Sequence, residues 1–253
     1  DLNHKINFVQ SLRSSEDYIY KHVLNVAILS AIIAGQMGFP VGRINLLVKS
    51  AILHDIGALK LQQLPDAEDL DDGTKEVVKK NTQETLDRYG DLDEEVLRLI
   101  TQMQELYTRE SDAEFPAGLK ESVNANILYV ADAYDRMTAM KSFEEPTSEV
   151  KAVRELLADE ERYNKKIVNA LIHGISILYP GVCVELSNGE KGLVITGNEE
   201  NIFEPTVLDF RNNNLYDLSD PSVKQTVEIA DVMKTMDNRI KLDKSLLEEY
   251  QAN

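Results

Sequence analysis

Residues 51–57 of this chain read AILHDIG, and this short stretch decides both the expected fold and the expected chemistry. An apolar run that begins at Val48 ends here in His54 and Asp55, so both polar side chains stand at the end of a buried helix. A charged group is costly to bury unless it is paired or binds a metal ion. An imidazole beside a carboxylate suits a divalent ion such as manganese, iron or zinc. A His-Asp pair alone is weak evidence for such a site, so further ligands must come from elsewhere in the chain.

Helical periodicity extends on both sides of this stretch, from about residue 15 to residue 178. One apolar stripe runs through His22, Val26 and Leu29, which lie three or four residues apart. The breaks between periodic segments contain Pro or Gly, which oppose helix continuation, as at residues 38–40 and 144–146. The pattern predicts a mostly α helical bundle, with helices at about residues 15–37, 41–55, 73–89, 92–108, 120–141, 147–158 and 163–177.

The pattern changes after residues 179–181, Tyr-Pro-Gly, to the short alternating runs that are typical of β-strands. Asn188-Gly189 lies between two such runs and predicts a hairpin, because Asn and Gly tolerate the positive φ that these turns require. The last 30 residues return to a helix-forming composition. We therefore expect a helical domain over residues 1–178 and, over residues 179–253, a small C-terminal β appendage with a helical tail. Strands are predicted at residues 182–186, 192–195, 206–210 and 215–218.

Two further polar residues interrupt apolar helical stripes. His22 lies on the stripe of the helix that precedes the His-Asp pair, where an isolated histidine is ordinarily a hydrogen-bonded core residue. Asp132 follows the apolar run 127–131, and on its own it is compatible with one half of a buried ion pair. Together with His54 and Asp55 they form a set of two imidazoles and two carboxylates on three helices. One divalent cation would satisfy all four side chains.

Composition excludes several classes of partner and site. The net charge of −17, from 44 acidic and 27 basic side chains, repels a polyanion, so we expect no nucleic acid partner. Four histidines are too few for a site built from many imidazoles, and the single cysteine, Cys183, fits a reducing, cytoplasmic location. No run of about 20 apolar residues occurs, so we expect no membrane-spanning segment in this fragment. Because the chain begins with Asp1 rather than Met, an upstream sensor or membrane part is an open expectation.

Three motifs occur in an order and at spacings that resemble the HD-GYP family of the HD metal-dependent phosphohydrolase superfamily. They are YKHVLNVA at residues 20–27, AILHDIG at residues 51–57 and VADAYDRMT at residues 130–138. Residues 179–190 also look like the β extension that follows some members of that family.

The resemblance implies an HD-superfamily helical bundle in bacterial cyclic di-GMP signalling. Members of the family carry two or three metal ions and hydrolyse cyclic di-GMP with metal-activated water. By resemblance, metal-ligand roles fall on His22, His54, Asp55 and Asp132, and Asp55 is the residue on which catalysis would depend. A metal ion in such a site lowers the pKa of bound water and neutralises charge on the attacked phosphate.

The chain departs from the family's pattern at positions that would hold phosphate and further metal ions. Ala58 stands where the family has a lysine after the His-Asp motif, and Asn81 stands where it has a histidine ligand. The family's HHExxDGxGYP signature falls on residues 106–116, where both of its histidines are replaced. Arg109 is retained in this segment, where a guanidinium either binds a substrate phosphate or forms a surface ion pair. We therefore expect one divalent ion at most, manganese, iron or zinc.

Three functions remain open from the sequence alone. The favoured one is a degenerate HD-GYP-like domain that binds a cyclic dinucleotide or another nucleotide and relays a signal, with weak or no phosphodiesterase activity. The second is an active, metal-dependent cyclic di-GMP phosphodiesterase, and the third is a mononuclear HD phosphohydrolase that acts on another nucleotide. A signalling role also predicts an upstream sensor or a partner signalling protein, and the helix faces are compatible with a homodimer.

Overall fold

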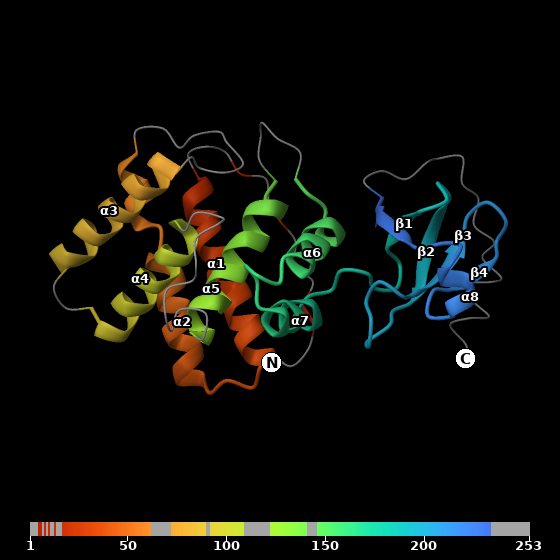
Figure 1. Ribbon diagram of the computed structural model, residues 1–253, viewed down its shortest axis with the longest axis horizontal. Coiled ribbons are helices and arrows are strands. Elements are labelled where there is room, and N and C mark those ends of the chain that lie inside the picture. Colours follow the sequence, from red (N-terminus) through yellow and green to blue (C-terminus); the bar gives the residue numbers. More distant parts are fainter. Residues whose placement is uncertain are drawn as a thin grey trace. The chain divides into compact units, whose positions relative to one another are not determined.

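The computed structural model of the chain describes residues 5, 6, 8, 10, 13, 17–61, 72–89, 92–108, 122–140 and 146–233. The chain divides into two compact units, of which one consists of residues 1–147 and 152–175. The other consists of residues 148–151 and 176–253. Figure 1 shows that helices dominate the first unit and that the second unit contains an antiparallel sheet.

The helices follow the periodicity of the sequence, and the predicted fold class, mostly α with a C-terminal β appendage, is confirmed. In chain order they are α1 (Tyr18–Gln36), α2 (Val41–Leu53), the 3₁₀-helix η1 (Ile56–Lys60), α3 (Asp72–Tyr89), α4 (Glu94–Thr108), α5 (Val123–Thr138), α6 (Glu149–Ala158) and α7 (Lys165–Gly174). Gly38 has a φ of 73°, the left-handed conformation in which many helices end, and it separates α1 from α2.

α1 packs against α2, α5 and α7 and so lies at the centre of the helical unit. Its side chains Leu29, Ile32 and Ile33 are removed from solvent. Gly174, at the end of α7, allows a close approach to α1, since a Cβ there would lie 2.2 Å from Ile32 Cγ2. The position of α1 is therefore fixed from several sides, and α1 carries the first of the polar core residues.

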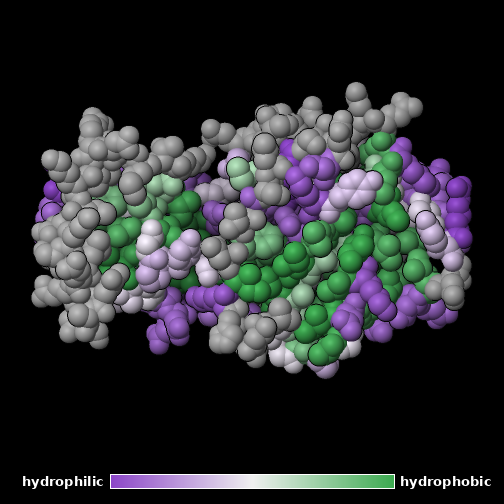
Figure 2. Space-filling view, turned by 180° about the vertical axis from the view of Figure 1, so that it is seen from behind, coloured by the Kyte–Doolittle hydropathy of each residue, from purple (hydrophilic) through white to green (hydrophobic). Residues whose placement is uncertain are grey.

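Within the described ranges, α1 is also the one helix that is long and apolar enough to cross a membrane, judged by length and composition alone. Of the apolar 18-residue stretch of α1 that meets this criterion, 56% is buried inside the structure. The core helix of a soluble protein meets the same criterion of length and hydropathy. Tyr20, Leu24 and Ile28 lie on its exposed side. Figure 2 shows apolar side chains at the surface of the helical unit.

η1 follows the His-Asp pair directly and packs against α3. Gly57 makes this contact possible, because a Cβ at this position would lie 2.3 Å from the backbone nitrogen of Thr82 and 2.4 Å from the carbonyl oxygen of Val78. The Gly57 N–H donates a hydrogen bond to Thr82 Oγ1 at 3.0 Å. A glycine is therefore favoured at position 57 for a steric reason, because a side chain there would keep η1 from packing directly against α3.

The second unit is a five-stranded antiparallel sheet in the order β4-β3-β2-β1-β5. Its strands are β1 (Cys183–Leu186), β2 (Lys191–Thr196), β3 (Thr206–Asp209), β4 (Leu215–Asp217) and β5 (Ile229–Val232), with a short helix α8 (Pro221–Lys224) before β5. Gly189 has a φ of 81° between β1 and β2, which confirms the predicted hairpin. Val184 and Val207 are fully buried on the inner face of this sheet.

β5 lies within the C-terminal stretch that we expected to be helical, so that expectation is wrong for residues 229–232. β5 pairs with β1, and Ile229 stands opposite Leu186. Ile229 and Asp231 are buried and alternate with less buried residues, as in a strand. The local composition favours a helix here, but pairing with the edge of β1 decides the conformation. Residues 234–253 of the expected tail lie outside the described residues.

We predict that Gly57→Ala lowers the free energy of unfolding by about 1–3 kcal/mol, the usual cost of overpacking, because the backbone of α3 lies in the way. Gly42→Ala is the matched control, since nothing lies within 4 Å of a Cβ at that position of α2. The control should be unchanged or more stable by less than about 1 kcal/mol. Urea unfolding followed by circular dichroism measures both variants, and equal stabilities would contradict the steric role of Gly57.

Candidate metal centre

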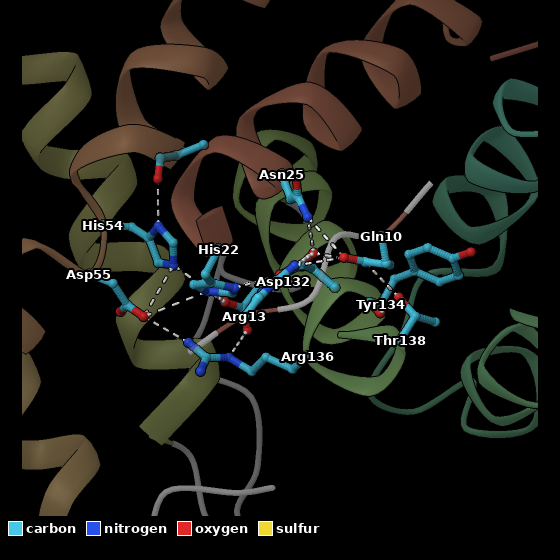
Figure 3. Close-up of polar contacts among 12 residues, drawn as sticks. Gln10, Arg13, His22, Asn25, His54, Asp55, Asp132, Tyr134, Arg136 and Thr138 are labelled. Carbon is cyan, nitrogen blue, oxygen red and sulfur yellow. Dashed lines mark hydrogen bonds and ion pairs between the residues drawn. The ribbon is translucent and has the colours of Figure 1, made fainter. Parts of the chain in front are cut away.

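The four polar residues that stand out in the sequence meet in the interior of the helical unit (Figure 3). α1 supplies His22, the turn between α2 and η1 supplies His54 and Asp55, and α5 supplies Asp132. One ligand atom from each residue lies within 4.8 Å of the other three. All four residues are buried, and the most accessible of them is 6% exposed. Two imidazoles and two carboxylates therefore converge on one point; we refer to them as the cluster.

A break in the helix explains how the neighbours His54 and Asp55 both reach the cluster. α2 ends at Leu53, and Asp55, with φ −112° and ψ 18°, lies outside regular helical geometry. His54 Nδ1 lies 2.6 Å from the carbonyl oxygen of Ala51 and donates a hydrogen bond to it. Because Nδ1 then carries the proton of the neutral ring, the lone pair of Nε2 faces the carboxylates. His54 Nε2 is 3.3 Å from Asp132 Oδ1 and 3.6 Å from Asp55 Oδ2.

His22 is oriented by a carboxylate behind it. Its Nδ1 lies 2.7 Å from Asp135 Oδ2, and its Nε2 lies 2.9 Å from Asp132 Oδ1. Metal-binding histidines commonly have this arrangement, in which a carboxylate accepts the proton of the nitrogen that does not bind the ion. Asp135 is itself held by Arg13, whose Nη1 and Nη2 donate to its two oxygens at 2.8 and 2.6 Å. A chain of buried contacts thus connects the segment before α1 with a cluster residue.

Sequence reasoning gave no role to Asp135 or Arg13. The sequence does contain a signal for Asp135, because it follows Asp132 by three residues and so shares its buried helix face. Arg13 had no local signal, since it lies before the first predicted helix and its partner is 122 residues away. The Asn25 side chain donates to Asp135 as well, at 2.9 Å.

Arg136 completes the polar surroundings of the cluster. Its Nε–H donates to Asp132 Oδ2 at 2.9 Å, and its Nη2–H donates to Asp55 Oδ2 at 2.7 Å. The guanidinium carbon lies 4.9 Å from the ring centroid of Tyr107. In the sequence this arginine stands one helical turn after Asp132, a spacing at which side chains meet.

The charges of these groups act on one another. Burial raises the pKa of Asp55 and of Asp132, but the imidazoles and the Arg136 guanidinium outweigh it, so both pKa values lie below the ordinary value. Burial lowers the pKa of His54, but the carboxylates of Asp55 and Asp132 outweigh this effect and the pKa is raised. At neutral pH the two carboxylates are therefore ionised, and a divalent ion would compete with a proton for His54.

The residues of the cluster fit a divalent cation. Each imidazole presents Nε2 to the centre while Nδ1 is bonded to an acceptor, Ala51 for His54 and Asp135 for His22. Two nitrogen and two carboxylate donors suit manganese, iron or zinc. Within the part of the chain that the structure describes, this is the one group of three or more His, Cys, Asp or Glu residues with such geometry.

A cavity of about 360 Å³ adjoins the cluster, and Asp132 and Arg136 belong to its lining. The rest of the wall includes three tyrosines, two basic residues and one acidic residue: Tyr107, Tyr129, Tyr163, Lys75, Arg162 and Glu155. Tyr129 and Tyr163 stack with ring centroids 5.3 Å apart, and Lys75 Nζ lies 5.2 Å from the Tyr107 centroid. Basic groups bind phosphates and aromatic rings stack on bases, so the cavity offers both kinds of contact that a nucleotide makes.

The positions at which the chain departs from the HD-GYP pattern lie near the cluster without joining it. Ala58 packs in a small apolar group between η1, α1 and α3. The Asn81 amide lies 3.5 Å from the carbonyl oxygen of Gly57, and Leu106 is buried in the core. Arg109, the candidate phosphate-binding residue, lies outside the described residues, so its role stays a prediction.

Comparison with known proteins relates the segment that carries this site to a known domain. Residues 19–137 match the HD domain, a span that includes all four residues of the cluster. The chain contains an HD domain. It is similar to the cyclic di-GMP phosphodiesterase PA4108 of Pseudomonas aeruginosa, with 22% identity over 204 residues, and to the cyclic di-GMP phosphodiesterase PdeB of Borreliella burgdorferi, with 24% identity over 234 residues.

The two alignments cover 79% and 88% of this chain but only 49% and 60% of the relatives. The chain therefore corresponds to about half of the length of these phosphodiesterases. The expected resemblance is confirmed at this level: this is an HD-domain protein distantly related to cyclic di-GMP phosphodiesterases, with a His/Asp cluster that suggests divalent metal binding.

We predict that the metal-free HD-domain protein loses stability as the pH rises above about 6.5, the ordinary pKa of histidine. The pKa of His54 is raised in the folded state. Its protonated form therefore stabilises the fold at low pH, and this stabilisation is lost as the pH rises through the folded-state pKa. Urea unfolding in EDTA at several pH values measures the slope, which His54→Gln should flatten. A wild-type stability that rises with pH over this range would contradict the prediction.

Proposed function

We propose that this HD domain holds one divalent ion and binds a cyclic dinucleotide or another nucleotide as a regulatory domain, with weak or no phosphodiesterase activity. The observation that carries the proposal is an intact four-residue cluster beside positions that have lost their ligand character. Asn81 and residues 106–107 stand where the HD-GYP pattern has histidines. Their side chains, an amide, an aliphatic group and a phenol, are poor substitutes for imidazole as metal ligands.

The ion would be held by Nε2 of His22, Nε2 of His54 and the carboxylates of Asp55 and Asp132. When bound, it would act as a Lewis acid and lower the pKa of a water molecule. The chain itself contributes orientation, because Asp135 holds the His22 ring from behind. A two-metal centre stabilises both the attacking and the leaving oxygen of a phosphodiester, and a one-metal centre lacks half of that clamp. Slow or absent hydrolysis follows from this difference.

The cavity supports a nucleotide as the ligand. Lys75, Arg136 and Arg162 give its wall three basic groups, beside the carboxylates of Asp132 and Glu155, in a protein whose net charge is −17. The tyrosines beside them supply flat surfaces for a base. Because the relatives are named for cyclic di-GMP, this compound is the first ligand to test.

A second candidate is an active phosphodiesterase, on cyclic di-GMP or, with a single ion, on another nucleotide. The observation in its favour is that the four residues of the HD motif are all present and converge. Metal-dependent turnover distinguishes it from the regulatory domain. A cytoplasmic location, an upstream sensor or partner signalling protein and a homodimer belong to the same proposal and rest on the sequence alone.

We predict about one divalent ion per chain when the protein is purified with manganese and iron available, and Asp55→Ala should abolish binding by removing one of four ligands. Asp87→Ala, which removes an exposed carboxylate of α3, is the matched control and should keep the ion. Elemental analysis of the three proteins gives the result. No ion in the wild type would remove the basis of the proposal, and two or more would show ligands beyond the cluster.

We predict that the chain binds labelled cyclic di-GMP and that Arg162→Ala weakens binding on the order of tenfold, the effect of losing one charge-assisted hydrogen bond to phosphate. Arg98→Ala is the control. Both arginines form an i,i+3 ion pair with a surface carboxylate, Arg162 with Asp159 and Arg98 with Glu95, but only Arg162 lines the cavity.

Fluorescence anisotropy measures the affinity of each protein, and chromatography of the same mixtures detects hydrolysis. Equal affinities of the two variants would exclude the cavity as the binding site. Hydrolysis that requires metal and disappears in Asp55→Ala would favour the phosphodiesterase instead.

A further inference from the structure

Arg136 binds both carboxylates of the cluster at once. Its Nε–H donates to Asp132 and its Nη2–H donates to Asp55, at 2.9 and 2.7 Å (Figure 3). The Asp55 oxygen that accepts this bond is Oδ2, the same atom that lies 3.7 Å from His22 Nε2 and 3.6 Å from His54 Nε2. The guanidinium and a metal ion would therefore compete for one oxygen of Asp55.

Asp132 is shared in a different way. Its Oδ2 accepts from Arg136, whereas its Oδ1 faces the two imidazoles at 2.9 and 3.3 Å. Arg136 and an ion would thus bind opposite oxygens of one carboxylate, a few ångströms apart. At such a distance between buried groups, the repulsion of two positive charges is substantial.

The charge of Arg136 is balanced mainly by Asp55 and Asp132. The third carboxylate nearby, Asp135, is neutralised by its two-point ion pair with Arg13. Asp55 and Asp132 are left to balance Arg136, whose side chain is only 11% exposed. With both imidazoles neutral, the two carboxylates carry two negative charges before an ion binds, and Arg136 balances one of them.

Several contacts fix the position of the Arg136 side chain. Two hydrogen bonds to different carboxylates define its plane, and its guanidinium lies 4.9 Å from the Tyr107 ring centroid. Tyr107 occupies the second histidine position of the HD-GYP signature, as aligned in the sequence. The guanidinium of Arg136 therefore lies beside Tyr107, which stands where the family's pattern has a metal-binding histidine.

We infer that Arg136 is a built-in cation of this centre: it keeps Asp55 and Asp132 paired before a metal ion binds, and it lowers the affinity of the cluster for that ion. This inference rests on the proposed one-metal function and gives it a regulatory property, a metal affinity set by an internal competitor. It also gives the two buried carboxylates a partner when no ion is bound, and an unpaired buried carboxylate is strongly destabilising.

The test compares wild type with Arg136→Gln, which removes the charge but keeps a hydrogen-bond donor, and with Arg136→Lys, which keeps the charge. Titration of the full chain with Mn²⁺ against a chelating indicator gives the affinity. We expect Arg136→Gln to bind Mn²⁺ on the order of tenfold or more tightly than wild type, because a nearby like charge is gone. The affinity of Arg136→Lys for Mn²⁺ should stay close to that of wild type.

Thermal unfolding gives a second readout that does not depend on activity. In EDTA, Arg136→Gln should melt at a lower temperature than wild type, because two buried carboxylates lose their partner. Saturating Mn²⁺ should restore most of the difference, so the rise in melting temperature on adding metal should be larger in the variant than in wild type.

Weaker Mn²⁺ binding by Arg136→Gln, or an unchanged affinity, would overturn the inference; weaker binding would make Arg136 a residue that only positions the ligands. Asp55→Ala separates this failure from failure of the proposed function. If wild type binds one ion that Asp55→Ala loses, the one-metal proposal stands whatever Arg136→Gln does. If neither wild type nor Arg136→Gln binds Mn²⁺, both are wrong.

Discussion

Two carboxylates buried in an apolar core are the constraint on which the rest of this structure depends. Asp55 and Asp132 are at most 6% exposed, and removing an unpaired carboxylate from water costs several kcal/mol. The helical unit offsets this cost with the imidazoles of His22 and His54 and the guanidinium of Arg136. These groups come from α1, from the turn after α2 and from α5. The geometry of the cluster therefore depends on how these three elements pack together. The same carboxylates favour the binding of a divalent ion, since the ion would supply the remaining positive charge.

The support of the cluster reaches well beyond its four residues. Asp135 orients His22 and is itself held by Arg13, which ties the segment before α1 to the end of α5. On the opposite side, Gly57 brings η1 against Thr82 of α3. A change at either end therefore alters the position of a ligand and the stability of the fold together.

Local sequence patterns were sufficient for most helices and for the four cluster residues. His22 and Asp132 stand out because each places a polar group on an apolar helical stripe, and such a stripe is visible over a few turns. Arg13 does not stand out, since its carboxylate partner is 122 residues away and its own segment shows no periodicity. The contact of Arg136 with Asp55 depends on how α5 lies against the turn after α2, and β5 depends on the free edge of β1. Both are outcomes of tertiary packing that no local pattern contains.

Residues 19–137 match the HD domain, and within this span four residues converge in a His/Asp cluster that suggests divalent metal binding. We propose that the cluster binds a single divalent ion. A crystal structure of the full chain with Mn²⁺, with anomalous diffraction used to locate the metal, tests this proposal. We expect one anomalous peak, bound by Nε2 of His22, Nε2 of His54 and oxygens of Asp55 and Asp132. No peak at the cluster, or two peaks within the helical unit, would contradict it.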